Sequence, residues 1–340
     1  MSPHPSIEIV GGGLAGLSLG LALRRENVPV RIVEAGDYPR HRVCGEFITG
    51  LDRATMARLG LDPLLEDARR HHEVAWFMGD TLTRVQRLPA PALGMSRYTL
   101  DARLASAFVA AGGELLSHTR MTDRGSPPGR VLATGRRPGR SSWIGLKIHV
   151  EGLTLERDLQ LHLGRNAYVG LARIEGKRVN VCGLFRRGDA TGRGIGLLPA
   201  TLRRAGLETL ARRLETATFN TDSFCAVAGL EFASRVAGAD RLRIGDACAM
   251  IPPFTGNGMA MAFQSACLAL DPLLAYARGK ADWDATCAAT HAALHKRFRM
   301  RLASARAVHP FLLGPSRQRF VALLSRARLL PFGSLYSALH

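Results

Sequence analysis

The sequence predicts an α/β protein in which a Rossmann-like domain carries an inserted antiparallel sheet. Helix-like and strand-like stretches alternate along the 340 residues, as in α/β proteins. A glycine-rich turn joins the first strand to the first helix. The stretch 143–184 is rich in strands with alternating apolar residues, which indicates an antiparallel sheet with one buried face. With 46% hydrophobic residues, the chain is long enough to bury a large core.

The composition excludes several classes of function. The net charge of +18 comes almost entirely from Arg, but the Arg residues are spread along the chain without a block of five or six, so we do not expect nucleic-acid binding. The six Cys residues form no C-x-x-C pair, which argues against a zinc site and a disulfide framework, and no metal is expected. A strand begins almost at once, and no apolar run reaches the roughly 18–20 residues of a membrane span. We therefore expect a cytoplasmic protein.

The first motif predicts dinucleotide binding. The predicted strand 7–10 leads into Gly11, Gly13 and Gly16, which fit G-x-G-x-x-G, and a predicted helix follows over 17–25. Gly11 makes the tight turn, Gly13 lets the backbone approach a pyrophosphate, and Gly16 lets the helix pack closely. The pyrophosphate would lie at the helix N-terminus. A second predicted strand, 30–33, ends at Glu34, which is placed to accept a hydrogen bond from an adenosine ribose hydroxyl.

A second motif lies far downstream. A predicted strand ends at Gly245-Asp246, and the loop Ile251 to Met259 leads into a predicted helix over 259–270. The carboxylate of Asp246 can reach a polyol hydroxyl. The N–H groups of the loop and the helix N-terminus can stabilise an anionic group, which suits the edge of a reduced flavin.

With these motifs, residues 7–274 resemble the superfamily of FAD-dependent monooxygenases and geranylgeranyl reductases, which has the p-hydroxybenzoate hydroxylase-like fold. Two further segments agree with it: Arg97-Tyr98-Thr99-Leu100-Asp101 with the helix 102–111 and Gly112-Gly113, and Val131-Leu132-Ala133-Thr134-Gly135. The resemblance implies FAD as cofactor, bound by Gly11, Gly13, Leu14, Ala15, Gly16, Glu34, Arg42, Arg97, Asp246, Pro253, Gly256, Asn257, Gly258 and Met259. Asp246 would bind the ribityl chain, and the loop 253–258 would flank the isoalloxazine ring.

The segment Arg42-Val43-Cys44-Gly45-Glu46-Phe47 resembles a subgroup of bacterial flavoproteins with C-G-E-F after the second strand. In that subgroup a Cys-Gly pair lies close to the flavin, so Cys44 is a candidate catalytic residue that faces the flavin or the substrate. A nucleophilic role would need a lowered thiol pKa. The alternative is a small buried Cys that packs the turn.

The substrate side is expected on the antiparallel sheet. The segment Asn166 to Leu171 resembles the Tyr-containing substrate motif of geranylgeranyl reductases, so Tyr168 is a candidate pocket residue; its alternative is a Tyr at the edge of the core. Many hydroxylases of this group have Asp-Gly where this chain has Thr134-Gly135. This departure puts direct use of NADPH as electron donor in doubt and leaves room for a separate donor.

These observations predict a discontinuous FAD-binding domain of residues 1–72, 96–140 and 235–285, a substrate domain of 73–95 and 141–234, and a helical tail of 286–340. The Arg-rich helices of the tail, 295–302 and 320–330, either pack on the domain or contact an anionic membrane. The leading function is a monooxygenase-like oxidoreductase that hydroxylates an apolar, aromatic or polyketide-type small molecule. A flavin-dependent reductase of carbon–carbon double bonds and a non-catalytic flavin-binding protein are the alternatives.

Overall fold

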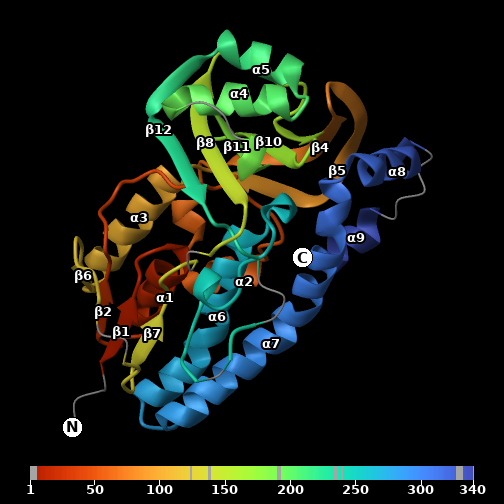
Figure 1. Cartoon of the computed structure of the whole chain (residues 1–340). Helices are drawn as coiled ribbons and strands as arrows, with labels where there is room; N and C mark the ends of the chain where they lie inside the picture. The colour runs from red at the N-terminus through yellow and green to blue at the C-terminus, as the bar shows by residue number, and fades with distance from the viewer. Residues whose placement is uncertain are drawn as a thin grey trace.

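The computed structural model describes residues 6–122, 125–136, 139–189, 193–232, 236–238, 240–326 and 332–339. Its elements form a small parallel sheet and a large, mostly antiparallel sheet, with helices packed around both (Figure 1). The predicted α/β architecture is confirmed.

The small sheet is parallel throughout and has the strand order β6-β2-β1-β7. Its strands are β1 (Ile7–Val10), β2 (Val30–Val33), β6 (Glu114–Leu116) and β7 (Arg130–Leu132). Strands β1 and β2 have the predicted bounds, because their β-branched residues are buried in the core, whereas Glu8 is half-buried and Arg31 is exposed. Helix α1 (Leu14–Arg25) begins three residues before the predicted start, directly after its N-cap residue Gly13.

The prediction of a strand that ends at Gly245-Asp246 is wrong. Leu132 and Arg243 form one isolated parallel bridge at the edge of the small sheet, and a short 3₁₀ turn, η4 (Gly245–Ala247), follows. The positive φ of 60° at Gly245 ends the extended conformation there. The segment before Asp246 still reaches the edge of the small sheet, although it does not form a further strand of that sheet.

Helix α1 packs on β1 and β2, and α3 (Arg97–Ala110) packs on β6 and α1. Helices α2 (Arg53–Leu59) and α6 (Gly258–Ala277) pack on α1, and α7 (Trp283–Val308) packs on α6. Helix α6 is longer than predicted and continues past Pro272 to Ala277. By length and composition α6 could cross a membrane, but 61% of its most apolar window is buried inside the protein, where it packs against α1.

The large sheet has the order β12-β8-β11-β10-β9-β4-β5-β3. Its strands are β3 (Phe47–Ile48), β4 (Arg69–Met78), β5 (Thr81–Gly94), β8 (Trp143–Glu151), β9 (Leu159–Gly164), β10 (Ala167–Arg173), β11 (Val179–Arg186) and β12 (Thr218–Ala228). The pairs are antiparallel, as predicted from the alternation, apart from the parallel pair β4 and β9.

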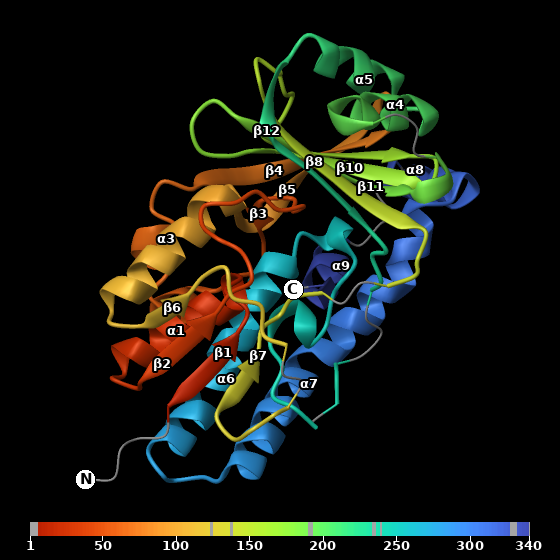
Figure 2. The same ribbon diagram turned by 60° about the vertical axis from the view of Figure 1, so that its left-hand side comes forward.

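The two faces of the large sheet have different roles. Helices α4 (Leu197–Arg204) and α5 (Glu208–Glu215) cover the outer face (Figure 1). Together with the side chains on that face they form a separate apolar core. The inner face is turned toward the small sheet, the loop before α6 and the C-terminal helices (Figure 2). Because side chains alternate along a strand, Lys147 and His149 of β8 lie on the inner face and Leu146 and Ile148 on the outer face.

The C-terminal segment is helical, as predicted. Helix α7 packs along α6, and η6 (His309–Leu312), α8 (Pro315–Arg326) and α9 (Phe332–Leu339) follow. The end of the helix predicted over 320–330 lies outside the described residues. Leu312 of η6 and Gln318 of α8 reach the large sheet, since Gln318 donates to the Gly164 carbonyl at 2.7 Å.

Candidate functional site

The glycine loop after β1 has the geometry that its motif predicts. Gly11 has a φ of 110°, and a Cβ there would lie 2.3 Å from the carbonyl oxygen of Ala133. A Cβ at Gly16 would lie 2.0 Å from the carbonyl oxygen of Gly11. A Cβ at Gly13, in contrast, would meet nothing within 4 Å. The space in front of the first turn of α1, where Leu14 and Ala15 expose their N–H groups, is therefore open for an anion.

Glu34, at the end of β2, fixes this loop. Its carboxylate accepts hydrogen bonds from the N–H groups of Gly12 (2.7 Å) and Gly36 (2.9 Å) and from Arg40 (2.6 Å), and the residue is 5% exposed. Burial alone would raise the pKa of the Glu34 carboxyl, but these N–H groups and the charges of Arg40 and Arg42 lower it below its ordinary value. Glu34 is therefore ionised and organises the glycine loop.

The lowered pKa of Glu34 makes stability depend on pH on the acid side. We expect the contribution of Glu34 to be complete above the ordinary carboxyl pKa of 4.5 and to be lost as the pH falls through the lower pKa of the folded state. Thermal unfolding of the wild type and of Glu34→Gln between pH 7 and pH 3 measures this. The stability difference between the two should shrink below about pH 4.5; a difference that does not change with pH would contradict the assignment.

Two arginines and one carboxylate form a charged cluster beside the glycine loop. Asp101 of α3 is fully buried and accepts from Arg97 Nε (2.7 Å) and Nη2 (2.8 Å) and from Arg42 Nε (3.0 Å). Burial would lower the pKa of Arg97, but Asp101 raises it above its ordinary value, so the guanidinium stays charged. The three groups carry one net positive charge, which favours a bound anion.

Two features of this cluster are typical of a binding site. Arg97 is the first residue of α3, at the helix end where the backbone dipole disfavours a cation. Within the described residues, Arg42 Nη2 is a buried guanidinium atom without a hydrogen-bond partner, as are Arg40 Nε, Arg136 Nη1, Arg243 Nε and Arg301 Nη2. Because buried donors are nearly always satisfied, the three that lie near Glu34 or Asp246, on Arg40, Arg42 and Arg136, indicate a missing acceptor at this site.

Asp246 lies next to the first turn of α1. A Cβ at the preceding Gly245 would lie 3.0 Å from the Cβ of Ala15, and the Gly245 N–H donates to Ser265 of α6 at 2.8 Å. The Asp246 side chain is reached by solvent, yet surrounding protein atoms raise the pKa of its carboxyl, against the opposing charges of Arg97 and Arg136. Asp246 is therefore an exposed carboxylate near the charges of Arg97 and Arg136.

Hydrogen bonds of the Asn257 side chain hold the loop that precedes α6 in place. This residue is fully buried; its Oδ1 accepts from the Thr49 hydroxyl at 3.0 Å, and its Nδ2 donates to the carbonyl of Leu339 in α9. Gly256 has a φ of 69°, and a Cβ there would clash with the ring of Phe47. Pro253 lies in the 3₁₀ turn η5 (Pro253–Thr255), Gly258 begins α6, and Met259 is buried in the core. The loop thus connects the C-G-E-F segment, α6 and α9.

Cys44 lies in the same neighbourhood and is half-buried. Its sulfur accepts from the Glu46 N–H at 3.4 Å, and its carbonyl accepts from Asn180 of β11 at 2.9 Å. Burial raises the pKa of the Cys44 thiol in spite of the nearby Arg97 charge. The thiol is therefore protonated at neutral pH, which argues against a nucleophilic thiolate.

Tyr168 is separate from these groups. It lies 4% exposed on the inner face of the large sheet, where its ring packs edge-on against Phe254 of the loop before α6 and against His309 of η6. Its apolar surroundings come from both sheet and tail: Leu161, Leu163, Leu184, Leu230 and Leu312, with Trp76, Met78, Trp143 and Phe232 at the margin. This apolar cluster packs the loop against the sheet, since Met250 and Phe254 of the loop belong to it.

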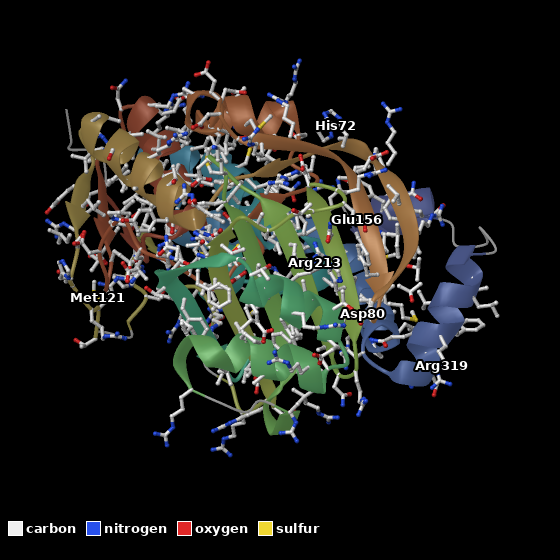
Figure 3. The ribbon with its side chains drawn as sticks, turned by 90° about the horizontal axis from the view of Figure 1, so that it is seen from above. His72, Asp80, Met121, Glu156, Arg213 and Arg319 are labelled. Atoms are coloured by element: carbon white, nitrogen blue, oxygen red, sulfur yellow. The ribbon has the colours of Figure 1, made fainter. Side chains whose placement is uncertain are left out.

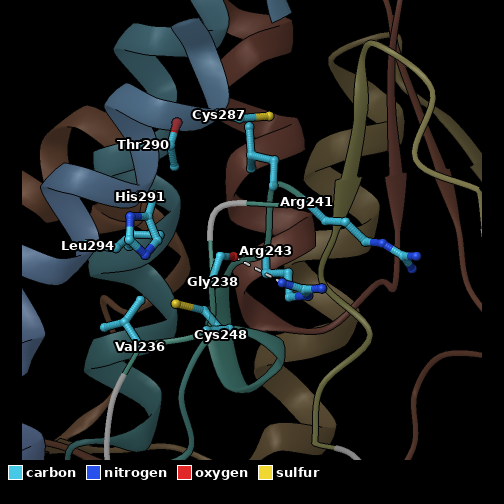
Figure 4. A pocket seen from close by; sticks show the side chains of 11 residues that line it. Val236, Gly238, Arg241, Arg243, Cys248, Cys287, Thr290, His291 and Leu294 are labelled. Carbon is cyan, nitrogen blue, oxygen red and sulfur yellow. Dashed lines mark hydrogen bonds between the residues drawn. The ribbon is translucent and has the colours of Figure 1, made fainter. Parts of the chain in front are cut away.

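Two cavities lie elsewhere. A crevice of about 10 Å³ between the loop 236–248 and α7 has room for at most about one water molecule (Figure 4). A larger cavity of about 280 Å³ lies on the outer face of the large sheet beneath α5, where Figure 3 labels Asp80, Glu156 and Arg213. Neither contains any of the predicted site residues.

Contacts therefore bring together the glycine loop, Glu34, Arg42, Arg97 and Asp246, which are far apart in the sequence. The sequence reasoning missed Asp101 as the partner of both arginines, and it missed the side chains of Glu46, Lys147 and His149, which form a buried cluster. The sequence does contain a signal for Lys147 and His149. They lie two residues apart in an apolar strand and therefore share one face of it, and buried charged residues need partners.

No family model matches the chain. In sequence, it is similar to a protein named menaquinone reductase from Mycolicibacterium smegmatis, at 25% identity over 313 residues that cover 80% of this chain and 76% of the relative. In structure, it is similar to Pseudomonas aeruginosa PqsL in complex with 2-aminobenzoylacetate (TM-score 0.72, 18% identity, 93% of this chain and 98% of that one). It is also similar to Klebsiella pneumoniae HpxO complexed with FAD and uric acid (TM-score 0.76, 16% identity, 100% of this chain and 96% of that one). The chain has the fold of these two proteins, of which PqsL is described as a probable FAD-dependent monooxygenase and HpxO contains FAD.

Proposed function

We propose that the protein is an FAD-dependent oxidoreductase. The observation that carries this proposal is the open space before α1 at Gly13, together with the buried guanidinium atoms of Arg40, Arg42 and Arg136 that have no hydrogen-bond partner among the described residues. A pyrophosphate supplies the anionic oxygen atoms that such a site lacks. The shared fold with a structure that contains FAD supports the same cofactor.

Each part of the site has a role in this proposal. The N–H groups of 13–16 and the charge of Arg42 and Arg97 hold the pyrophosphate, and Glu34 orients the loop and accepts from the adenosine ribose. Asp246 accepts from the ribityl chain, and the loop 253–259 flanks the ring. FAD, when bound, supplies the hydride and electron transfer that amino-acid side chains lack. The protein binds, orients and excludes water.

The leading reaction is hydroxylation of an aromatic or polyketide-type small molecule. The apolar cluster around Tyr168 forms the wall between the inner face of the large sheet and the loop before α6, so it excludes water from the substrate side. The similar structures hold flat, conjugated molecules, 2-aminobenzoylacetate in PqsL and uric acid in HpxO. Tyr168 would line the pocket for a substrate of that shape.

A second candidate is the reduction of a carbon–carbon double bond. It is favoured by the sequence relative, whose name is menaquinone reductase, and by the C-G-E-F segment, whose Cys44 lies beside Arg97. A protonated thiol at this place suits a group that packs or shields the site rather than one that attacks substrate.

One experiment tests the proposal and separates the two reactions. Purified protein should contain non-covalent FAD or take it up; protein that cannot be loaded with FAD contradicts the proposal. The loaded protein is then mixed with NADPH without oxygen while the absorbance of the oxidised flavin is followed. Rapid bleaching supports NADPH as donor and hydroxylation with oxygen. Reduction by dithionite alone points to a separate electron donor and to the double-bond reductase.

We also propose that the C-terminal region contacts an anionic membrane surface. Residues 285–340 contain nine Lys or Arg and no Asp or Glu. Large apolar side chains are exposed in the same region: Met300 (63%), Phe311 (41%), Phe320 (54%) and Leu323 (64%). Exposed apolar groups among basic residues favour binding to anionic lipid headgroups.

This contact predicts co-sedimentation with vesicles of phosphatidylglycerol and phosphatidylcholine, and weaker binding at high salt. Phe320→Glu with Leu323→Glu should reduce the bound fraction at least about tenfold, because each change replaces apolar area by a charge that the lipid repels. Val109→Glu on α3, where Val109 is 52% exposed, is the control and should bind as the wild type does. Equal binding to vesicles of phosphatidylcholine alone would contradict an electrostatic contact.

A further inference from the structure

Three charged or titratable side chains with no exposure to solvent lie between the C-G-E-F segment and the large sheet. They are Glu46, Lys147 and His149. Lys147 and His149 lie two residues apart on β8, so both reach the inner face of the sheet, where Glu46 meets them. Charged groups are almost never fully buried without a partner, so this cluster needs an explanation.

Glu46 is at the centre of the cluster. Its Oε1 lies 3.3 Å from Lys147 Nζ and accepts from the Arg97 N–H at 3.0 Å, and its Oε2 lies 2.5 Å from His149 Nε2. Lys147 Nζ also lies 3.1 Å from Nδ1 of His41, whose half-buried ring stacks on Tyr98. The carboxylate therefore joins β8 of the large sheet to the first residue of α3.

The hydrogen bonds determine the charges in this cluster. Burial and the neighbouring Lys147 and His149 lower the pKa of His41 to about 4, so at neutral pH its Nδ1 is an acceptor for the Lys147 ammonium. His149 Nδ1 is buried without a partner among the described residues, whereas Nε2 faces the carboxylate. Nε2 of His149 therefore donates to one oxygen of the Glu46 carboxylate, while Lys147 lies at the other oxygen.

The backbone of Glu46 is strained. Its φ is 56°, in the left-handed region that disfavours residues other than Gly, Asn and Asp. In the described part of the chain, the other non-glycine residues with positive φ are Asn27, His118 and Asn166. A strained residue persists only where its surroundings enforce the conformation, and such residues gather at functional sites.

The turn that Glu46 closes carries the site residues. The Glu46 N–H donates to the Cys44 sulfur, Asn180 holds the Cys44 carbonyl, and Arg42 reaches Asp101, to which Arg97 is also bound. A change in the backbone at Glu46 therefore moves both Cys44 and Arg42 relative to Arg97.

We propose that Glu46 is a positioning residue: its carboxylate, clamped by Lys147, His149 and the Arg97 N–H, holds the Glu46 backbone in its left-handed conformation and so places Cys44 and Arg42 beside Arg97. The proposal rests on the proposed function only in naming FAD as the ligand of this site. The clamp and the strain act together, because the ionic contacts stabilise a backbone conformation that glutamate would otherwise avoid.

The test separates backbone conformation from charge. Two double variants, Glu46→Ala with Lys147→Met and Glu46→Gly with Lys147→Met, remove the ion pair without leaving a buried charge. Alanine disfavours a φ of 56°, whereas glycine adopts it freely. The readouts are the dissociation constant of FAD, from flavin fluorescence, and the alkylation rate of Cys44 in the FAD-free protein, from peptide mass spectrometry.

We expect the alanine variant to bind FAD about tenfold more weakly and to expose Cys44 to about tenfold faster alkylation, the factor that corresponds to 1.4 kcal/mol. The glycine variant should recover most of both changes. If glycine is no better than alanine while both variants fold, or if both match the wild type, the proposal is wrong. Asn27→Ala and Asn27→Gly, at another left-handed residue after α1, are the matched controls and should leave both readouts unchanged.

Two further results keep the test decisive. If the double variants do not fold, Asn180→Ala removes the hold on the Cys44 carbonyl without changing any charge, and it should accelerate alkylation of Cys44 by a similar factor. Unchanged alkylation in Asn180→Ala would then overturn the proposal. If the wild type itself does not take up FAD, the proposed function fails, but the alkylation of Cys44 in the FAD-free protein still tests the role of Glu46.

Discussion

Gly13→Asp is expected to abolish FAD binding while the protein stays folded. A side chain at Gly13 meets nothing within 4 Å, and the backbone φ of −87° suits any residue. Asp is also a good N-cap residue, so the free energy of unfolding of the FAD-free protein should change by no more than a few tenths of a kcal/mol. Its carboxylate, however, would occupy the place of the pyrophosphate and compete for the same N–H groups.

The size of this effect follows from electrostatics. Two unit charges 4 Å apart repel by about 4 kcal/mol at an effective dielectric constant of 20, which corresponds to an affinity loss of roughly a thousandfold. Flavin fluorescence titration measures the affinity, and thermal unfolding measures the stability. Gly13→Asn has the same size without the charge and should lose much less. Wild-type affinity in Gly13→Asp would mean that no pyrophosphate binds before α1.

Gly11→Ala should behave in the opposite way. Its Cβ would lie 2.3 Å from the Ala133 carbonyl oxygen, and a φ of 110° is unfavourable for alanine, so the fold itself should be destabilised. The two glycines belong to one motif, but only the structure separates the one that packs from the one that faces open space.

Asp101→Asn is expected to cause the largest loss of stability among the site variants. Asp101 is fully buried and is bound by two guanidinium groups, which are 13% and 28% exposed at Arg97 and Arg42. Removing the carboxylate leaves both cations in a poorly solvated place, and breaking a buried pair in this way costs about 3–5 kcal/mol. Because both arginines retain some contact with water, we expect a value near the lower limit, measured by urea denaturation.

A second pair on the same helix is the control. Arg103 of α3 binds Asp67 at 2.5 Å, but Asp67 is 54% exposed, so Asp67→Asn should cost less than about 1 kcal/mol. Arg97→Met combined with Asp101→Asn should recover part of the lost stability, because one unpaired cation is removed. Equal costs at Asp101 and Asp67 would show that the buried cluster has no special role.

The sequence determined the fold more completely than it determined the site. The short β-branched strands β1 and β2 were predicted residue by residue, because local apolar runs and the glycine turn between them specify both. The strand before Asp246 was predicted wrongly, since one bridge to Leu132 at a sheet edge and a left-handed Gly245 are properties of tertiary pairing. The extension of α6 beyond Pro272 likewise depends on packing against α1.

Within the site, the separate motifs were predictable, and their connections were not. The sequence gives no indication that Arg42 and Arg97 share Asp101, because the residues lie 59 and 4 positions apart and meet only when α3 packs beside the loop. The buried Lys147 is a similar case: a lysine in an apolar strand raises the question of a partner, but Glu46 lies 101 positions earlier in the chain. The roles of Cys44 and Tyr168 stay predictions.

The order of strands in the two sheets also has a consequence for how the chain acquires its structure. Strand β1 pairs with β7, more than a hundred residues later, and β4 pairs in parallel with β9, 85 positions later. Contacts of such long range form late and slow the search for the native state. During synthesis, one edge of β4 stays unpaired until β9 has left the ribosome. Such an unpaired edge can pair with strands of other chains. We therefore expect N-terminal fragments that end before β9 to aggregate, and slower synthesis or lower temperature to improve the yield of the whole protein.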